Sequence, residues 1–117
     1  MGLDFTISEI QDDKINENGN RVYTVVELDN FGHAGYKCMD YGLGQQENCT
    51  TVAYESSKFL EVFDKMKKDL DEINKSGKDE YKEKADLENA IDKLQCFIET
   101  EKITEDTDRV FDIHIWY

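Results

Sequence analysis

The sequence predicts an α+β fold: a small antiparallel sheet of three to four strands, with a two-helix antiparallel hairpin packed on one face. Three observations lead to this prediction. Both ends of the chain alternate apolar and polar residues, the middle carries two apolar stripes with helical spacing, and the chain contains no proline. The expected order of elements is β-β-(β)-α-α-β. A chain of 117 residues suits a single domain covering residues 1–117.

Two strands are expected at the start of the chain. Residues 3–8 alternate apolar and polar side chains and predict a strand over 3–10, and residues 21–28 are rich in β-branched side chains and predict the second. The polar stretch 11–20 between them contains Asn18 and Gly19, a pair that tolerates the positive φ angles of a tight turn. We therefore predict an antiparallel hairpin, whose register the sequence leaves open.

The next part of the chain is irregular in sequence. Residues 30–48 hold four glycines, which predict a long loop or a short, bent strand. Residues 49–55 could form a further strand, because they contain Thr51, Val52 and Tyr54.

The first helix is predicted from an apolar stripe that runs from Phe59 to Ile73 at spacings of three and four. Ser56 or Ser57 could cap its start, and Gly77 provides a left-handed stop. These signals bound the helix at both ends.

A second helix is expected from about residue 79 to residue 100, folding back on the first because the connection between them is short. The tail, residues 110–117, is the clearest strand: Phe111, Ile113 and Ile115 alternate with other side chains. We expect it to return to the sheet, beside the first strand.

The excess negative charge is unevenly distributed. The chain has 27 acidic residues against 14 basic ones, a net charge of −13. Residues 58–102 carry only −3, and their acids and lysines at i,i+4 are typical of an ordinary solvated helix surface. Residues 1–57 carry −7 and residues 103–117 a further −3, with few bases nearby.

Two acidic clusters would share one side of the domain if the first and last strands are neighbours. Alternate carboxylates along a strand lie about 6.6 Å apart, a spacing similar to that of phosphates, and a field of one sign steers a basic partner. The alternative interpretation is that the charge only maintains solubility. The expected partner-binding residues are Asp12, Asp13, Glu17, Glu27, Asp29, Asp106, Asp108, Tyr36 and Tyr41.

Four aromatic residues fall outside the obvious core stripes. We expect Phe31 and Trp116 to pack against the fold, and Tyr36 and Tyr41 to be exposed. Exposed aromatic side chains beside a charged field are typical anchors of protein interfaces.

Several functional classes are disfavoured by the composition. Direct binding to nucleic acid needs a surplus of Lys and Arg, which is absent. No run approaches the roughly 18 apolar residues of a membrane span, and the acidic start lacks the features of a signal peptide. Three cysteines at irregular spacing do not suggest a disulfide framework. We therefore expect a cytoplasmic protein in a reducing environment.

The sequence contains no strong motif for a cofactor, a metal or catalysis. His33, Cys38, Asp40 and Cys49 lie close together in sequence, but they include no Cys-x-x-Cys pair and lack a fourth strong ligand. Phosphate-binding loops, dinucleotide fingerprints and nucleophile elbows are also missing. We expect no cofactor, no metal and no enzymatic activity.

The opening Met1-Gly2-Leu3-Asp4-Phe5, followed by an alternating strand, resembles the start of various small phage and mobile-element proteins. The short, strongly acidic, proline-free chain also resembles anti-CRISPR proteins and other phage-encoded inhibitors that mimic nucleic acid. This resemblance implies an inhibitor of host defence that binds a nuclease or another nucleic-acid-handling enzyme, in the host cytoplasm.

The leading hypothesis is therefore a non-enzymatic protein that binds a basic, nucleic-acid-binding protein surface through the carboxylates of its strands and loops. The alternative is a structural or assembly module that forms a homodimer through the C-terminal strand, residues 110–117. Large apolar groups on both faces of that strand suit either a central place in the sheet or an interface.

Overall fold

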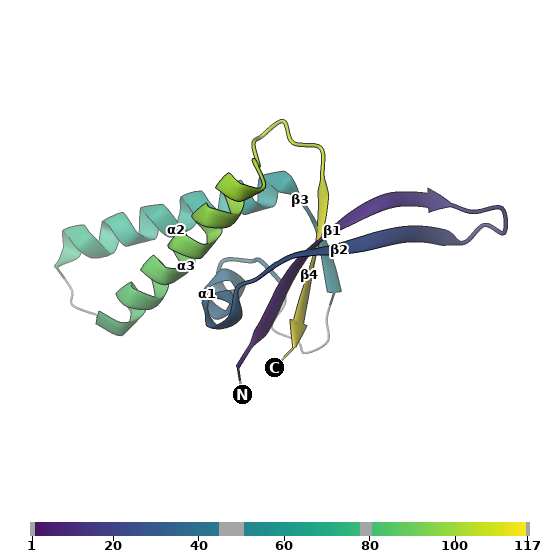
Figure 1. Cartoon of the computed structure of the whole chain (residues 1–117). Coiled ribbons are helices and arrows are strands. Elements are labelled where there is room, and N and C mark those ends of the chain that lie inside the picture. The colour runs from purple at the N-terminus through teal and green to yellow at the C-terminus, as the bar shows by residue number, and fades with distance from the viewer. Residues whose placement is uncertain (1, 45–50, 78–80, 117) are drawn as a thin grey trace.

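The structure is a computed structural model that describes residues 2–44, 51–77 and 81–116. Its four strands form one antiparallel sheet in the order β2-β1-β4-β3. Figure 1 shows the helices on one side of this sheet and the end of the β1–β2 hairpin projecting from the other side. The elements in chain order are β1 (Asp4–Ile15), β2 (Arg21–Asn30), the short 3-10 helix η1 (Gly32–Ala34), α1 (Gly35–Asp40), β3 (Thr51–Glu55), α2 (Ser56–Ser76), α3 (Tyr81–Thr100) and β4 (Val110–Trp116). The predicted α+β fold class is confirmed.

The C-terminal strand lies inside the sheet. β4 pairs with β1 from Asp4 opposite Trp116 to Ile10 opposite Val110, as expected for the last strand beside the first. On its other side β4 pairs with β3. From Val110 to His114, β4 therefore has a partner strand on each edge, and a homodimer through the C-terminal strand stays a prediction. Tyr117 lies outside the described residues.

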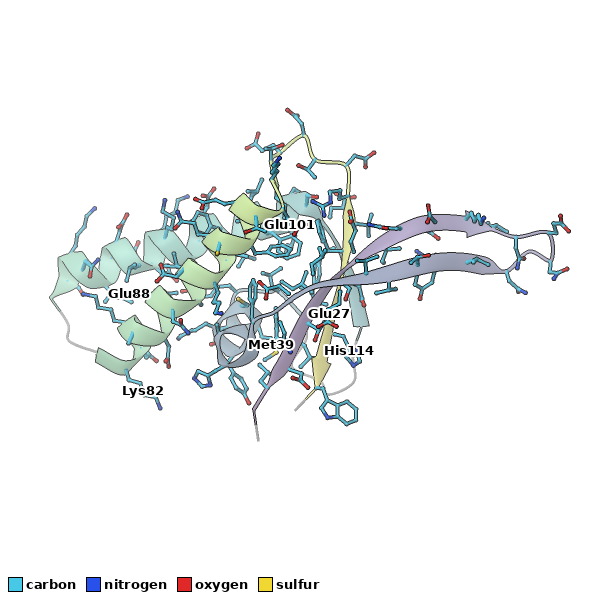
Figure 2. All side chains as sticks on the ribbon, in the orientation of Figure 1. Glu27, Met39, Lys82, Glu88, Glu101 and His114 are labelled. Atoms are coloured by element: carbon cyan, nitrogen blue, oxygen red, sulfur yellow. The ribbon has the colours of Figure 1, made fainter. Side chains whose placement is uncertain are left out.

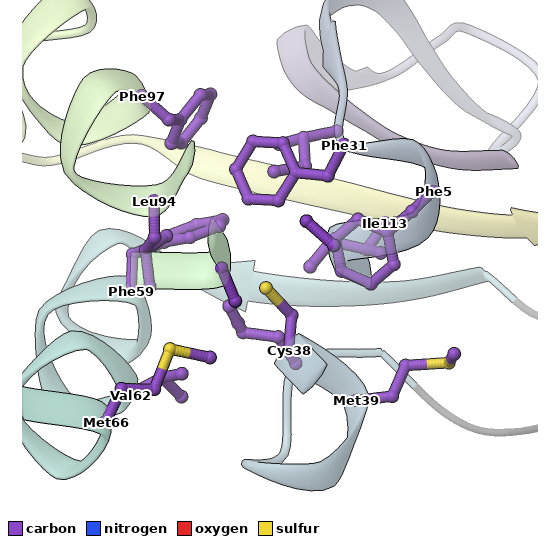
Figure 3. Close-up of a cluster of buried hydrophobic side chains, with 14 of the residues drawn as sticks. Phe5, Phe31, Cys38, Met39, Phe59, Val62, Met66, Leu94, Phe97 and Ile113 are labelled. Atoms are coloured by element: carbon purple, nitrogen blue, oxygen red, sulfur yellow. The ribbon is translucent and has the colours of Figure 1, made fainter. Parts of the chain in front are cut away.

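The hydrophobic core lies between the sheet and the helices. Alternate residues of β1 and β4 point toward the helices, where the rings of Phe59 and Phe97 pack against Phe111 with centroid distances of 5.0 and 5.9 Å. Figure 3 shows how α2 and α3 bring their apolar stripes onto this layer. The strand residues in the core are Phe5, Ile7, Phe111, Ile113 and Ile115, with Leu3 just before β1, and the helices α2 and α3 add Phe59, Val62, Met66, Leu87, Ala90, Ile91, Leu94 and Phe97.

The start of α2 differs from the prediction, whereas its end confirms it. Glu55 occupies the N-cap position and makes no side-chain capping bond. Neither Ser56 nor Ser57 is the cap: Ser56 is buried, and its hydroxyl donates a 3.2 Å hydrogen bond to the carbonyl of Arg109. That serine ties the start of α2 to the chain entering β4. Gly77 ends the helix with a φ of 64°, in the left-handed region.

The hairpin strands are longer than the sequence predicts. β1 continues through the polar stretch as far as Ile15, and its ladder with β2 ends at Ile15 opposite Arg21. Polar residues can continue a strand here because residues 11–15 lie beyond the core and are exposed. The turn contains the predicted Gly19, with a φ of 79°.

The segment expected to be a loop or bent strand instead contains η1 and α1. Buried residues recur at helical spacing through this segment, including Phe31, Ala34, Cys38 and Met39. The glycines obscured this spacing in the sequence. Gly35 permits close packing, because a Cβ there would lie 2.5 Å from Phe5.

The molecule is elongated, with principal extents of 61 × 35 × 19 Å. The α2–α3 hairpin and the end of the β1–β2 hairpin extend from the central core in opposite directions (Figure 1). No helix among the described residues is both long and apolar enough to cross a bilayer.

Candidate protein-binding surface

The outer part of the β1–β2 hairpin, residues 11–27, is a two-stranded ribbon that we call the arm. Its residues are exposed apart from Asn16, which is half-buried. Several of the exposed side chains are apolar: those of Ile15, Tyr23 and Val25 are 75%, 47% and 48% exposed. A two-stranded ribbon is marginally stable alone in water. Exposed apolar residues on such an element are suited to contact with another protein.

Asn16 organises the tip of the arm. Its backbone N–H donates to the carbonyl of Asn20 at 2.8 Å, and its side-chain oxygen accepts hydrogen bonds from the N–H groups of Asn18 and Asn20. Glu17 lies within this turn and is exposed. The tip therefore presents one carboxylate on a hydrogen-bonded turn.

A bulge in β1 holds two of the predicted binding residues. Gln11 faces Thr24 and Lys14 faces Val22, so Asp12 and Asp13 together occupy the space opposite one residue of β2. Asp12 takes a φ of 53°, in the left-handed region that aspartate tolerates better than most residues.

The two bulge carboxylates differ in their partners. Asp13 accepts two hydrogen bonds of 2.8 Å from Arg21, and this partner lowers the pKa of Asp13. The guanidinium of Arg21 also lies 5.0 Å from the centre of the Tyr23 ring. Asp12 has no ion pair with the described residues. Asp12 rather than Asp13 therefore contributes uncompensated charge.

The α3–β4 loop lies beside the base of the arm. Because Ile10 is opposite Val110, the chain that leaves Ile10 toward Asp12 and the chain that enters Val110 from Asp108 meet at the same end of the β1–β4 pair, where they diverge (Figure 1). Asp12, Asp106 and Asp108 are all exposed. The fold therefore brings acidic residues that are almost 100 positions apart to one end of the β1–β4 pair.

Arg109, which follows Asp108 in the chain, does not pair with these carboxylates, because it has other partners. Arg109 donates from Nε to Glu9 at 2.5 Å, and from its two terminal nitrogens to the carbonyl oxygen and the carboxylate of Glu101, each at 2.8 Å. The hydrogen bond from Arg109 lowers the pKa of Glu9. The guanidinium also lies 4.9 Å from the ring centre of Phe111. Arg109 thus joins β1, α3 and β4.

The remaining predicted acids lie on β2. Glu27 is opposite Ser8 and is exposed on the side of the sheet away from the helices, where Figure 2 also shows His114. Asp29 is half-buried opposite Ile7 and accepts a hydrogen bond from the backbone N–H of Asn30. Asp29 is therefore less accessible than the others.

We call the uncompensated, exposed carboxylates of the arm and loop the acidic surface. Its members form no ion pair with a lysine or arginine in the described part of the chain. The acidic surface comprises Asp12, Glu17, Glu27, Glu105, Asp106 and Asp108.

The two predicted tyrosines lie apart from the acidic surface, on the helical side of the molecule. Tyr36 is exposed, as expected, but it belongs to α1. The expected exposure of Tyr41 is wrong: it is half-buried and donates a 2.6 Å hydrogen bond to Asp69 of α2. Burial and that carboxylate raise the pKa of Tyr41.

Of the expectations for the other two aromatic residues, one is confirmed and one is wrong. Phe31 is buried, as expected, and stacks on Phe5 with ring centres 5.7 Å apart. Trp116 is 50% exposed, contrary to expectation, because it ends β4 on the side of the sheet that the helices do not cover.

The sequence reasoning missed a buried polar pair on that same side. Ser8 and Asp112 face each other across β1 and β4, and both are buried. Asp112 Oδ1 has no hydrogen-bond partner, and burial raises the pKa of this carboxyl, whereas His114 opposes that shift. Alternation along β4 predicts that Asp112 points to the face of the sheet away from the core. No sequence signal indicates that its side chain is buried on that face.

The described residues offer little support for metal or nucleophile chemistry. They contain no group of three or more His, Cys, Asp or Glu residues placed to hold a metal ion. Cys38 is buried, which raises its pKa to about 12, so the thiol stays protonated at neutral pH. Cys96 is exposed on α3, and Cys49 lies outside the described residues.

A hollow of about 300 Å³ lies between α1 and α3. Lysines and carboxylates both line it, among them Lys37, Lys82, Glu83 and Asp86. The mixed charge gives no field of one sign, so this hollow indicates no particular ligand class.

Comparisons of the chain with protein-family models, curated proteins and solved structures find no match. The inference of function therefore depends on the placement of charge and of exposed strand edges in this fold.

Proposed function

We propose that the chain is a non-enzymatic acidic protein that binds and inhibits a nucleic-acid-handling protein, in the manner of a phage anti-defence factor. The acidic surface would occupy the basic groove that otherwise holds a nucleic-acid backbone. The arm suits entry into a groove because it projects as a narrow ribbon and has exposed apolar side chains beside its carboxylates (Figure 1).

The observation that carries this proposal is the pairing of Ile10 with Val110. That register brings the base of the arm and the end of the α3–β4 loop to the same end of the β1–β4 pair, while Arg21 and Arg109 are held by other carboxylates. Clustered like charges are unfavourable within one molecule, whereas a basic partner would be attracted by them. These exposed carboxylates, which form no ion pair among the described residues, support a role in binding.

The proposal can be tested by capture on the immobilised full chain from a bacterial lysate, followed by elution with duplex DNA. We expect captured proteins that themselves bind nucleic acid and that DNA releases. The double variant Asp12→Lys/Asp108→Lys should retain much less of them, because it reverses charge where the arm meets the loop.

A matched control carries the same change in net charge at the opposite end of the molecule. Asp71→Lys/Glu88→Lys alters exposed residues of α2 and α3, where Figure 2 labels Glu88. It should retain the captured proteins as the unmodified chain does. Equal loss with both variants, or capture that DNA does not compete, would contradict the proposed function.

A further inference from the structure

The strand β2 lies at an edge of the sheet. β1 pairs with one side of it, and no strand in the described part of the chain pairs with the other. The opposite edge strand, β3, has five residues, whereas β2 has ten. Long, exposed edge strands readily pair with another chain, and proteins usually protect them with proline, lysine or a covering element. β2 contains neither proline nor lysine.

The exposed part of this edge is regular. Between Arg21 and Glu27 the extra residues of the ladder lie in β1, so β2 itself runs without a bulge. The irregularity within β2 comes at Leu28, which is half-buried against the core. Residues 21–27 are therefore an uninterrupted run of seven residues with a free hydrogen-bonding edge.

The sequence of this run is complementary to itself in antiparallel orientation. If two copies align with Thr24 opposite Thr24, each remaining residue meets a suitable counterpart. Arg21 faces Glu27, Val22 faces Val26, and Tyr23 faces Val25, with every pair repeated by the two-fold axis. The alignment thus joins opposite charges at both ends and apolar residues between them.

From this we infer that the chain forms a symmetric homodimer in which two β2 strands pair antiparallel through residues 21–27. The partner on this edge is a second copy of the same chain, and the two four-stranded sheets become one continuous sheet.

The side-chain arrangement within one chain agrees with this dimer. Arg21, Tyr23, Val25 and Glu27 share one face of β2, because side chains alternate along a strand. The contact of the Arg21 guanidinium with the Tyr23 ring is consistent with this shared face. Arg21 bonds to Asp13 through Nε and one terminal nitrogen, which leaves its other terminal nitrogen to donate to Glu27 of the second copy.

The dimer would also explain the exposed apolar residues of β2. Val22, Tyr23, Val25 and Val26 are between 37% and 48% exposed in one chain. In the dimer each lies beside an apolar side chain of the second copy. Cross-strand pairs of this kind stabilise sheets.

Sedimentation at increasing protein concentration tests the inference. The unmodified chain should approach twice its 13.6 kDa mass. Arg21→Glu and Glu27→Arg should each weaken self-association by about tenfold or more, because like charges then face each other at both ends of the paired run. A mixture of the two variants should associate again, since one carries Glu and the other Arg at both positions.

Two further sets of variants complete the test. Lys93→Glu and Glu88→Arg, on α3, are matched controls: they change the net charge as Arg21→Glu and Glu27→Arg do, but away from β2. Both should leave self-association unchanged. Val22→Glu with Val26→Lys should associate better mixed than apart, and this pair retains the Arg21–Asp13 contact, so it remains informative if Arg21→Glu does not fold. A chain that stays monomeric at every concentration, or mixtures that do not associate, would overturn the inference.

Discussion

At the scale of single residues, Arg109 connects more of the fold than any sequence pattern indicates. It bonds to Glu9 of β1 and to Glu101, just after α3, and it precedes β4. The side chains of these three residues are 25%, 14% and 20% exposed, so water screens them only in part. Breaking a partly buried ion pair leaves charges that are neither paired nor fully hydrated.

We therefore expect Arg109→Ala to lower the free energy of unfolding by about 2 kcal/mol at pH 7, less than for a fully buried pair. Urea denaturation measures this change. Arg21→Ala, which breaks an exposed pair, should have little effect. Because the pKa of Glu9 is lowered in the fold, its contribution is present above the ordinary pKa of 4.5 and is lost as the pH falls through the folded value. A loss in Arg109→Ala that persists unchanged at acid pH would contradict this account.

Asp112 should have the opposite pH dependence. Its pKa is raised by burial, so the fold favours its protonated form, and that stabilisation disappears as the pH rises through the folded pKa. Asp112→Asn removes the buried charge with little change in shape. We expect it to raise the free energy of unfolding by about 1 kcal/mol at pH 7, with the gain shrinking toward acid pH. Thermal unfolding across this pH range measures the effect, and a destabilised variant at pH 7 would contradict it.

At the scale of the elements, the packing of α1 against β1 depends on a single missing side chain. A Cβ on Gly35 would lie 2.5 Å from the Cβ and Cγ of Phe5, which is fully buried and cannot move aside easily. Gly35→Ala should therefore destabilise the protein by about 2 kcal/mol, within the range for overpacked cores. Gly2→Ala, where a Cβ meets nothing within 4 Å, serves as the control. Equal stability of the two variants would show that α1 can shift.

The elements also show what the sequence could and could not predict. The end of α2 and the presence of β4 follow from local signals, a left-handed glycine and strict alternation, whereas the serine cap predicted for the start of α2 was wrong. α1 was missed because its apolar spacing lies among glycines. The length of β1 was missed because residues 11–15 bury nothing, so no apolar pattern marks them as a strand.

The candidate site was predictable in part for the same reason. Charge counting identified Asp12 and Asp108, and the expected pairing of the first and last strands put them at the same end of the sheet. The pairing of Asp13 with Arg21 depends on a bulge, and the pairing of Arg109 with Glu9 depends on contacts 100 residues apart. Neither can be read from sequence spacing.

At the scale of the whole molecule, charge and shape are divided between two ends. The α2–α3 hairpin has acids and lysines in near balance, whereas the exposed carboxylates of the acidic surface have no ion-pair partner among the described residues, because Arg21 and Arg109 pair with other carboxylates. In the inferred dimer the paired arms would lie at the centre and the helical hairpins outside. Each half would keep the other carboxylates of its acidic surface, whereas Glu27 would pair with Arg21 of the second copy.

The account depends most on the acidic surface being a binding site for basic protein surfaces. The direct measurement is the affinity of a captured partner as a function of salt, compared between the unmodified chain, Asp12→Lys/Asp108→Lys and Asp71→Lys/Glu88→Lys. We predict that binding weakens steeply up to about 0.5 M NaCl for the unmodified chain and the helix variant. The arm variant should bind weakly and with a shallow dependence on salt. An affinity that does not change with salt, or that falls equally in both variants, would contradict the central claim.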